Sequence, residues 1–202
     1  IGPGDAVALP DYTFFATAGV VTRLGARPVF VDVEPVHQNM DPDALERALD
    51  ANPDVRAVIA VHLFGVGADM ERLLELTNAR DLPLIEDAAQ AIGAEYKNKR
   101  AGSLGDIGCF SFFPTKNLGG IGDAGMVTTN SDALYEKLHI LRVHGGHPKY
   151  YHKFIGGNFR LDTIQAAVVQ AKLPHLDGWT KQRQDNAEHY RTLIRDAGLE
   201  DN

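Results

Sequence analysis

The 202-residue sequence predicts an α/β fold in which a mostly parallel sheet is flanked by helices. The main observation is that short segments typical of strands alternate along the chain with segments of helical periodicity. A second is that a strand-like run such as residues 83–86 is short and apolar, as expected when helices cover both faces of a sheet. The length and the hydrophobic content of 44% suit one large α/β unit.

The first half of the chain contains four of the strand-like segments. Strands are expected at residues 6–9, 28–33, 58–62 and 83–86, and helices at residues 13–24, 41–51 and 69–80. Asp41 and Pro42 mark a helix start, because an aspartate caps the N-terminus and proline fits the first turn. In the third helix Met70, Leu73 and Leu76 recur with the helical period, so they form its inward face.

The second half continues the alternation. Strands are expected at residues 107–113 and 125–129, and helices at residues 131–142, from about Asp162 onward, and at residues 179–197. Pro114 ends the first of these strands, because proline cannot donate to a β-ladder. The glycines at positions 119, 120, 122 and 125 allow a tight turn before the second strand. Lys116 is therefore expected on a small-residue loop between two strands.

Two nucleotide-binding motifs have partial matches in this loop. Gly120, Gly122 and Gly125 form a GxGxxG pattern, but a dinucleotide site needs a helix after the motif, whereas the following MVTT segment is typical of a strand. A Walker phosphate loop is excluded because Lys116 is followed by Asn117 rather than serine or threonine, and no glycine precedes it at the required spacing. Lys116 itself is the candidate functional group.

Composition and charge exclude several classes of partner. The net charge is −7 with both signs interspersed, which gives no basic surface for nucleic acid, and no apolar run approaches the length needed to cross a bilayer. The single cysteine, Cys109, excludes an intramolecular disulfide and suits a reducing compartment, so a cytoplasmic location is expected. The chain opens on IGPGDAVALP without a signal segment and stops just after a helical pattern, so it is expected to be the central part of a longer protein.

Asp87 is the second candidate functional residue. It lies in the segment EDAAQ, at the carboxyl end of an expected strand, where α/β sheets place functional groups. A buried carboxylate needs a partner, and a pyridinium nitrogen is one possibility. The alternative is a helix cap for residues 88–91. Glu86 alternates to the opposite face of the strand and is the weaker candidate.

The segments SFFPTKNLGGIGDAG and EDAAQ resemble those of the pyridoxal-phosphate-dependent nucleotide-sugar aminotransferases of the DegT/DnrJ/StrS group, and the resemblance covers nearly the whole chain. It implies an aspartate-aminotransferase-like large domain, that is, the type I fold of pyridoxal phosphate enzymes. Residues 1–178 would form this cofactor-binding domain, with its N-terminal part missing. Residues 179–202 would connect to a small C-terminal domain.

The resemblance also implies the cofactor contacts. Lys116 would form the Schiff base with pyridoxal 5′-phosphate, and Asp87 would pair with the pyridine nitrogen. Gln90, expected one helical turn after Asp87, would reach the ring hydroxyl oxygen. Ser111 would donate to the phosphate, and Phe14 would stack on the ring.

A partner subunit is implied as well. Asn158 matches the family's asparagine that reaches the cofactor phosphate of the other subunit of a homodimer. Arg160 is expected in a structural ion pair.

The implied activity is transamination from an amino acid, usually glutamate or glutamine, to a nucleotide-linked keto sugar. Two alternatives remain open. A dehydratase branch of the same family carries histidine in place of the Schiff-base lysine, so Lys116 argues against it. A non-catalytic regulatory protein with the same fold is the other, although none of Asp87, Gln90, Ser111 and Lys116 is altered.

The segment HGGHPKYYHK contains three histidines, at positions 144, 147 and 152. Their spacing lies in a loop containing glycine and proline rather than on one helical face, and no carboxylate is placed to complete a metal shell, so no metal site is predicted. Tyr151 and His152 are instead predicted to contact an anionic substrate beside the active site.

Overall fold

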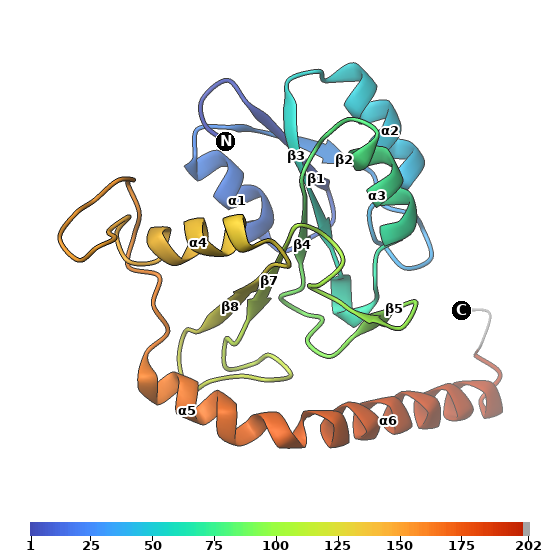
Figure 1. Cartoon of the computed structure of the whole chain (residues 1–202). Coiled ribbons are helices and arrows are strands. Elements are labelled where there is room, and N and C mark those ends of the chain that lie inside the picture. The colour runs from blue at the N-terminus through green and yellow to red at the C-terminus, as the bar shows by residue number, and fades with distance from the viewer. Residues whose placement is uncertain (200–202) are drawn as a thin grey trace.

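The computed structural model describes residues 1–199, and in this range the chain forms a six-stranded sheet with the order β2-β1-β3-β4-β7-β8 (Figure 1). The strands are β1 (Ala6–Pro10), β2 (Arg27–Val31), β3 (Val55–Val61), β4 (Leu84–Asp87), β7 (Ile107–Ser111) and β8 (Gly125–Thr128). Neighbouring strands are parallel except for β8, which runs antiparallel to β7. The remaining two, β5 (Glu95–Tyr96) and β6 (Lys99–Arg100), form a separate small hairpin. The expected mostly parallel sheet is confirmed.

Helices lie on both sides of this sheet. They are α1 (Phe15–Arg23), α2 (Pro42–Ala51), α3 (Met70–Asn78), α4 (Asp132–Leu141), α5 (Thr163–Lys172) and α6 (Leu176–Asp196), with short 3-10 turns at η1 (Leu63–Gly65) and η2 (Leu173–His175). Figure 1 shows α2 and α3 on one side of the sheet and α1 on the other, with α5 and α6 forming an extended rod beneath it. None of the described helices combines the length and the apolar character that crossing a bilayer requires.

The helix starts follow from capping chemistry. The side chain of Asp41 accepts a hydrogen bond from the backbone of Asp43, and Pro42 occupies the first turn of α2, as the sequence predicts. Asp69 caps α3 and Ser131 caps α4 in the same way. α6 begins at Leu176, three residues before the expected start, and the last part of the expected connector, residues 200–202, lies outside the described residues.

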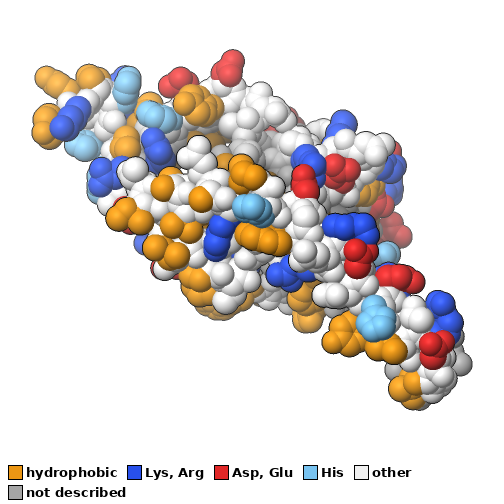
Figure 2. Space-filling view, turned by 90° about the horizontal axis from the view of Figure 1, so that it is seen from below, with side chains coloured by type: hydrophobic (Ala, Val, Ile, Leu, Met, Phe, Trp, Pro, Cys, Tyr) orange, Lys and Arg blue, Asp and Glu red, His pale blue; other side chains and the backbone are white. Residues whose placement is uncertain are grey.

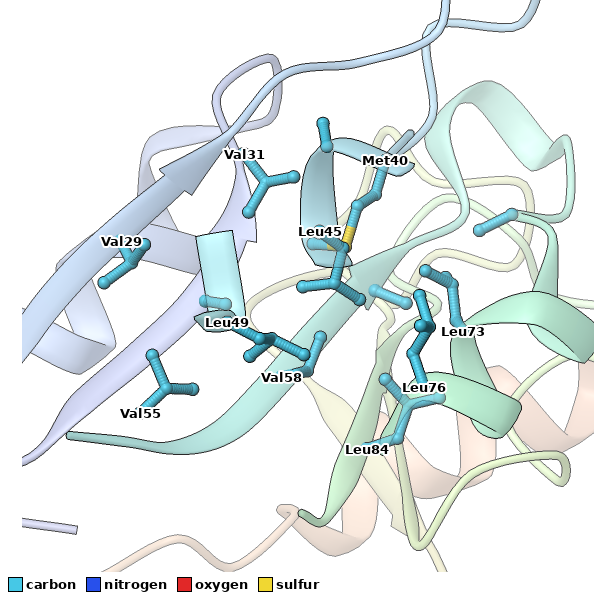
Figure 3. Packing of buried hydrophobic residues seen from close by; sticks show 14 of the residues in the cluster. Val29, Val31, Met40, Leu45, Leu49, Val55, Val58, Leu73, Leu76 and Leu84 are labelled. Atoms are coloured by element: carbon cyan, nitrogen blue, oxygen red, sulfur yellow. The ribbon is translucent and has the colours of Figure 1, made fainter. Parts of the chain in front are cut away.

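The core is divided by the alternation of side chains along β1. Ala6 and Ala8 face the larger cluster under α2 and α3, whereas Val7 and Leu9 face the smaller cluster under α1. Figure 3 shows the larger cluster, in which side chains from α2, α3 and the strands interdigitate. Each fully buried leucine there contributes about 1.5–3 kcal/mol relative to an exposed one. The sheet is therefore a rigid platform anchored on both faces.

Candidate active site

The carboxyl ends of the parallel strands form the edge at which the predicted site residues lie. Phe14 follows β1, Asp87 is the last residue of β4, and Ser111 is the last residue of β7. Lys116 lies in the loop that follows β7. Because β1, β3, β4 and β7 are parallel and adjacent in that order, these four side chains come from one edge of the sheet, where α/β folds bind their ligands.

Asp87 is fixed by two hydrogen bonds. The Thr17 hydroxyl donates to its Oδ2 at 2.8 Å, and the backbone N–H of Ala89 donates to its Oδ1 at 3.2 Å. Thr17 lies on α1 and is only 3% exposed, and the sequence reasoning did not single it out. Residues 88–94 form turns rather than a helix, so Asp87 does not cap a helix. The carboxylate is instead held at the strand end by groups from two different elements.

Gln90 lies on these turns, so its expected place one helical turn after Asp87 is wrong. The segment forms successive turns instead, in which the N–H groups of Ala91 and Ala94 donate to the carbonyls three residues earlier. The backbone N–H of Phe64 donates to the Oε1 of Gln90 at 2.9 Å, and Phe64 adopts the left-handed φ of 54° to do so. With its oxygen engaged, Gln90 keeps its amide N–H₂ as the group to offer a ligand.

A cleft of about 820 Å³ brings Gln90 and Lys116 together. Its walls are residues 64–65, residues 89–95, residues 115–117 and one face of α6 that carries Thr180, Arg183 and Gln184. Lys116 is half-buried, and its ammonium group forms no ion pair with any residue that the structure describes. A lysine in this position is available to a ligand.

The backbone of the Lys116 loop is tightly constrained. The N–H of Lys116 donates to the carbonyl of Phe113 at 2.9 Å, which closes the turn around Pro114. A Cβ at Gly119 would lie 2.4 Å from the carbonyl oxygen of Pro114, so glycine is required there. Lys172 on α5 donates to the carbonyl of Gly119 at 2.6 Å. The expected tight, small-residue loop is therefore present, and α5 fixes it from below.

Ser111 and Phe14 complete this edge. The Ser111 Oγ accepts a weak hydrogen bond of 3.3 Å from the N–H of Phe113, which leaves its hydroxyl hydrogen free to donate. Phe14 is 71% exposed at the N-cap position of α1. Its neighbour Phe15 lies along the helix over Gly19, whereas the carbonyl of Phe14 accepts a hydrogen bond of 3.1 Å from the N–H of Thr17, the residue that binds Asp87.

Asn158, Tyr151 and His152 lie elsewhere. They belong to the segment between α4 and α5, which projects from the body in Figure 1 and forms a protruding lobe in Figure 2. Tyr151 is 70% exposed, and none of the three lines the cleft that contains Lys116. Arg160 donates to the Oδ1 of Asn158 at 2.8 Å, so its expected ion pair is replaced, among the described residues, by a hydrogen bond to a neutral amide.

Glu86 is the residue that the sequence reasoning most undervalued. Its side chain is fully buried and accepts four hydrogen bonds, from His62 Nε2 at 2.9 Å and from the backbone N–H groups of Gly102, Leu104 and Gly105 at 2.7 Å each. Burial alone would raise the pKa of this carboxyl, but His62 and the three N–H donors outweigh it, so the pKa is lowered. The signal in the sequence was the glycine-rich segment at residues 102–105, which supplies backbone donors.

Curated relatives match the chain along nearly its whole length. It is 52% identical to a pleiotropic regulatory protein of Geobacillus stearothermophilus, over 98% of this chain and 52% of that protein. It is 47% identical to a UDP-N-acetyl-3-dehydro-α-D-glucosamine 3-aminotransferase of Acidithiobacillus ferrooxidans, over 94% of this chain and 51% of that protein. It is 44% identical to a dTDP-3-amino-3,4,6-trideoxy-α-D-glucose transaminase of Streptomyces venezuelae, over 98% and 52%. The chain thus spans about half the length of these relatives.

Solved structures have the same fold. An aminotransferase of the DegT/DnrJ/EryC1/StrS group from Brucella abortus superposes with a TM-score of 0.94 at 42% identity, over 97% of this chain and 54% of that one. The NtdA protein of Bacillus subtilis with bound cofactor PMP gives a TM-score of 0.80 at 34% identity, over 87% and 40%. These neighbours confirm the expected aspartate-aminotransferase-like fold. The family model for the DegT/DnrJ/EryC1/StrS aminotransferases matches residues 1–201, and the chain therefore belongs to that family.

Proposed function

We propose that the protein to which this chain belongs is a pyridoxal-phosphate-dependent aminotransferase that transfers an amino group from an amino acid, with glutamate the expected donor, to a nucleotide-linked keto sugar. The observation that carries the proposal is the fixed carboxylate of Asp87 on the sheet edge whose loops also bring Lys116 and Gln90 into one cleft. Support for the substrate class comes from the two relatives that are named as transaminases of UDP- and dTDP-linked sugars.

The residues at this edge fit the cofactor. Asp87 is an acceptor with one oxygen held by Thr17 and the other by Ala89, so each oxygen retains a lone pair for a protonated ring nitrogen. Gln90 offers an amide N–H₂ toward a ring oxygen, and Ser111 has a free hydroxyl for a phosphate. The exposed ring of Phe14 is available for stacking.

When bound, pyridoxal phosphate supplies an aldehyde that reacts with amines and a ring that withdraws electrons from the reacting carbon. Asp87 would keep the ring nitrogen protonated, which strengthens that withdrawal. Lys116 would hold the cofactor through Nζ and, when the substrate amine displaces it, would use the same Nζ to move the proton between the substrate and the cofactor. Its loop, closed by the turn at Phe113 and fixed by Lys172, would return that amine to the same place in each half-reaction.

The active unit in this proposal is a cytoplasmic homodimer with shared sites. Large apolar side chains are exposed around α5, namely Ile121 at 68%, Ile155 at 102%, Phe159 at 67% and Ile164 at 71%. Figure 2 shows hydrophobic side chains gathered on this side of the molecule. Exposed apolar patches of this kind are typical of interfaces. Asn158 would reach the phosphate of the partner's cofactor, and Tyr151 and His152 would contact the substrate there.

The test is a comparison of the intact protein with its Lys116→Ala variant. The wild-type protein should bind pyridoxal phosphate, and borohydride should fix the cofactor covalently on Lys116, as read from the mass of the peptide that contains it. Lys116→Ala should fold, since a loop lysine contributes little core packing, but should lose turnover with a nucleotide keto sugar and glutamate. Lys137→Ala, on the exposed face of α4, is the control for a lysine outside the cleft. A Lys116→Ala variant with full turnover would refute the proposal.

A regulatory function is the second candidate, because the relative at 52% identity is named as a pleiotropic regulatory protein. In that case the protein would bind its ligand without turnover. Retention of Lys116, Asp87, Gln90 and Ser111 favours catalysis, since a protein that only regulates has no need of the lysine amine. Tight cofactor binding with no turnover for UDP-, dTDP- or GDP-linked keto sugars would favour the regulatory function.

A further inference from the structure

Two threonine hydroxyls form a chain that ends on Asp87. The Oγ1 of Thr13 lies 2.9 Å from the Oγ1 of Thr17, which in turn donates to the Oδ2 of Asp87 at 2.8 Å. A hydroxyl carries a single hydrogen, and that of Thr17 is directed to Asp87, so Thr13 must be the donor in the first bond. The two hydroxyls therefore point in one direction, toward the carboxylate.

The chain connects separate parts of the fold. Thr13 and Thr17 lie before and within α1, which packs on β1 and β2, whereas Asp87 ends β4, on the far side of β3. Thr17 is 3% exposed, so water has little access to replace its hydroxyl. The other bond to Asp87, from Ala89 two residues away, is local and longer, at 3.2 Å. The orientation of the carboxylate toward the body of the sheet consequently depends on Thr17.

We propose that Thr17 is a positioning residue for Asp87, with Thr13 supporting it, so that this carboxylate presents its remaining lone pairs to the cofactor ring nitrogen in one fixed orientation. The inference rests on the proposed function. Thr17 does not touch the cofactor; it acts by holding Asp87. A chain of hydroxyls also polarises its last member, so that loss of Thr13 weakens the bond that Thr17 makes.

The experiment compares four variants of the intact protein by titration with pyridoxal phosphate after the cofactor has been removed. Thr17→Val keeps the shape of the side chain but removes its hydroxyl, and it should weaken cofactor binding about tenfold, the size of effect seen when a residue that orients a ligating group is removed. Thr17→Ser restores the hydroxyl and should bind within about twofold of wild type. Thr13→Val should show an intermediate loss. Thr22→Val, on the exposed face of the same helix, is the matched control and should bind as wild type does.

A second measurement separates positioning from packing. The absorbance of the bound cofactor should respond to pH differently in Thr17→Val than in wild type, because the ring nitrogen has a misplaced partner, whereas Thr17→Ser should follow the wild-type curve. If Thr17→Ser binds as poorly as Thr17→Val, the hydroxyl does not suffice to restore cofactor binding, packing at this position explains the loss, and the proposal is overturned.

Equal binding by wild type, Thr17→Val and Thr13→Val would also overturn it. If Thr17→Val does not fold, the cofactor affinities of wild type, Thr17→Ser and Thr13→Val decide. Only a chain of hydroxyls predicts that Thr13→Val binds the cofactor most weakly of these three. A wild-type protein that binds no cofactor would instead refute the proposed function.

Discussion

Replacement of Glu86 by glutamine tests the buried carboxylate that anchors β4. Two of its four donors face each carboxylate oxygen, with His62 and Gly102 on Oε2 and Leu104 and Gly105 on Oε1. Glutamine has one oxygen and one N–H₂ group. In either orientation of the amide, the N–H₂ group, itself a donor, therefore faces two of the four protein donors and cannot accept their hydrogen bonds. Two hydrogen bonds to a charged group are lost, and at about 1.5–3 kcal/mol each the variant should be destabilised by about 3–6 kcal/mol.

That loss is large against the total stability of a domain, which is about 5–15 kcal/mol. Glu86→Gln should therefore lower the urea midpoint of the intact protein by about 1 M or more, measured by circular dichroism. Glu75→Gln is the control, because it removes an equally charged side chain that is 58% exposed and pairs with Arg72 on the surface of α3. It should leave the midpoint unchanged. Equal midpoints for Glu86→Gln and wild type would refute the assignment of Glu86 as a structural anchor.

The effect of Glu86 should also depend on pH. Its pKa in the folded protein is lowered from the ordinary value of 4.5, so the unfolded state binds the proton more readily. The stability that the carboxylate contributes is therefore complete above about pH 4.5 and is lost as the pH falls through the lowered pKa of the folded state. The difference in urea midpoint between wild type and Glu86→Gln should be constant from pH 6 to pH 8 and should shrink in acid. A difference that grows on acidification would contradict this argument.

Asp87→Asn preserves the shape of the side chain but removes its charge, so cofactor affinity should fall about tenfold, as in Thr17→Val, and kcat should fall by more than that; an unchanged kcat would assign Asp87 to structure alone. Loss of the Asn158 hydrogen bond should weaken cofactor binding about ten- to a hundredfold, and Asn158→Asp should weaken it further, because it sets a carboxylate against the phosphate. A mixed dimer of Lys116→Ala and Asn158→Asp subunits should recover about half the wild-type activity if Asn158 acts across the interface, and a fully inactive mixed dimer would rule this out. Burial, together with the charges of Asp87 and Glu86, raises the pKa of Cys109 to about 11, so native protein should react slowly with iodoacetamide at pH 8 and fast only in urea.

The alternation of strands and helices was predictable because it depends on local patterns. Capping at Asp41 and the helical period from Met70 to Leu76 are properties of short segments, and the structure has both. The turn after Asp87 was not predictable in the same way. The segment AAQA favours a helix by composition, but in the structure it bonds to distant residues, with the N–H of Ala88 donating to Cys109 and Gln90 accepting from the N–H of Phe64.

The site was predictable to the extent that a motif marks it. Lys116 and Gln90 line one cleft, and Asp87 lies on the same edge of the sheet. Thr17 was not predicted as a site residue because its partner, Asp87, lies 70 residues later, and nothing in the sequence around Thr17 indicates that the two side chains meet. Asn158 remains a prediction that depends on a second subunit.

Glu86 and Asp87 point to opposite faces of β4. This arrangement has a consequence for how β4 finds its register against the neighbouring strands during folding. β4 has only four residues, and a slip of one position against β3 and β7 would turn each carboxylate to the other face of the sheet. Asp87, one methylene shorter, would then face the loop at residues 102–105, and Glu86 would take the place of Ile85, which packs against the smaller core cluster under α1. The four donors that surround Glu86 are thus placed to reach the carboxylate of a glutamate and would not be satisfied by the shorter side chain of an aspartate. β4 is too short to fix its own register, so the buried carboxylate of Glu86 on one face places the strand, and Asp87 on the other face is placed with it.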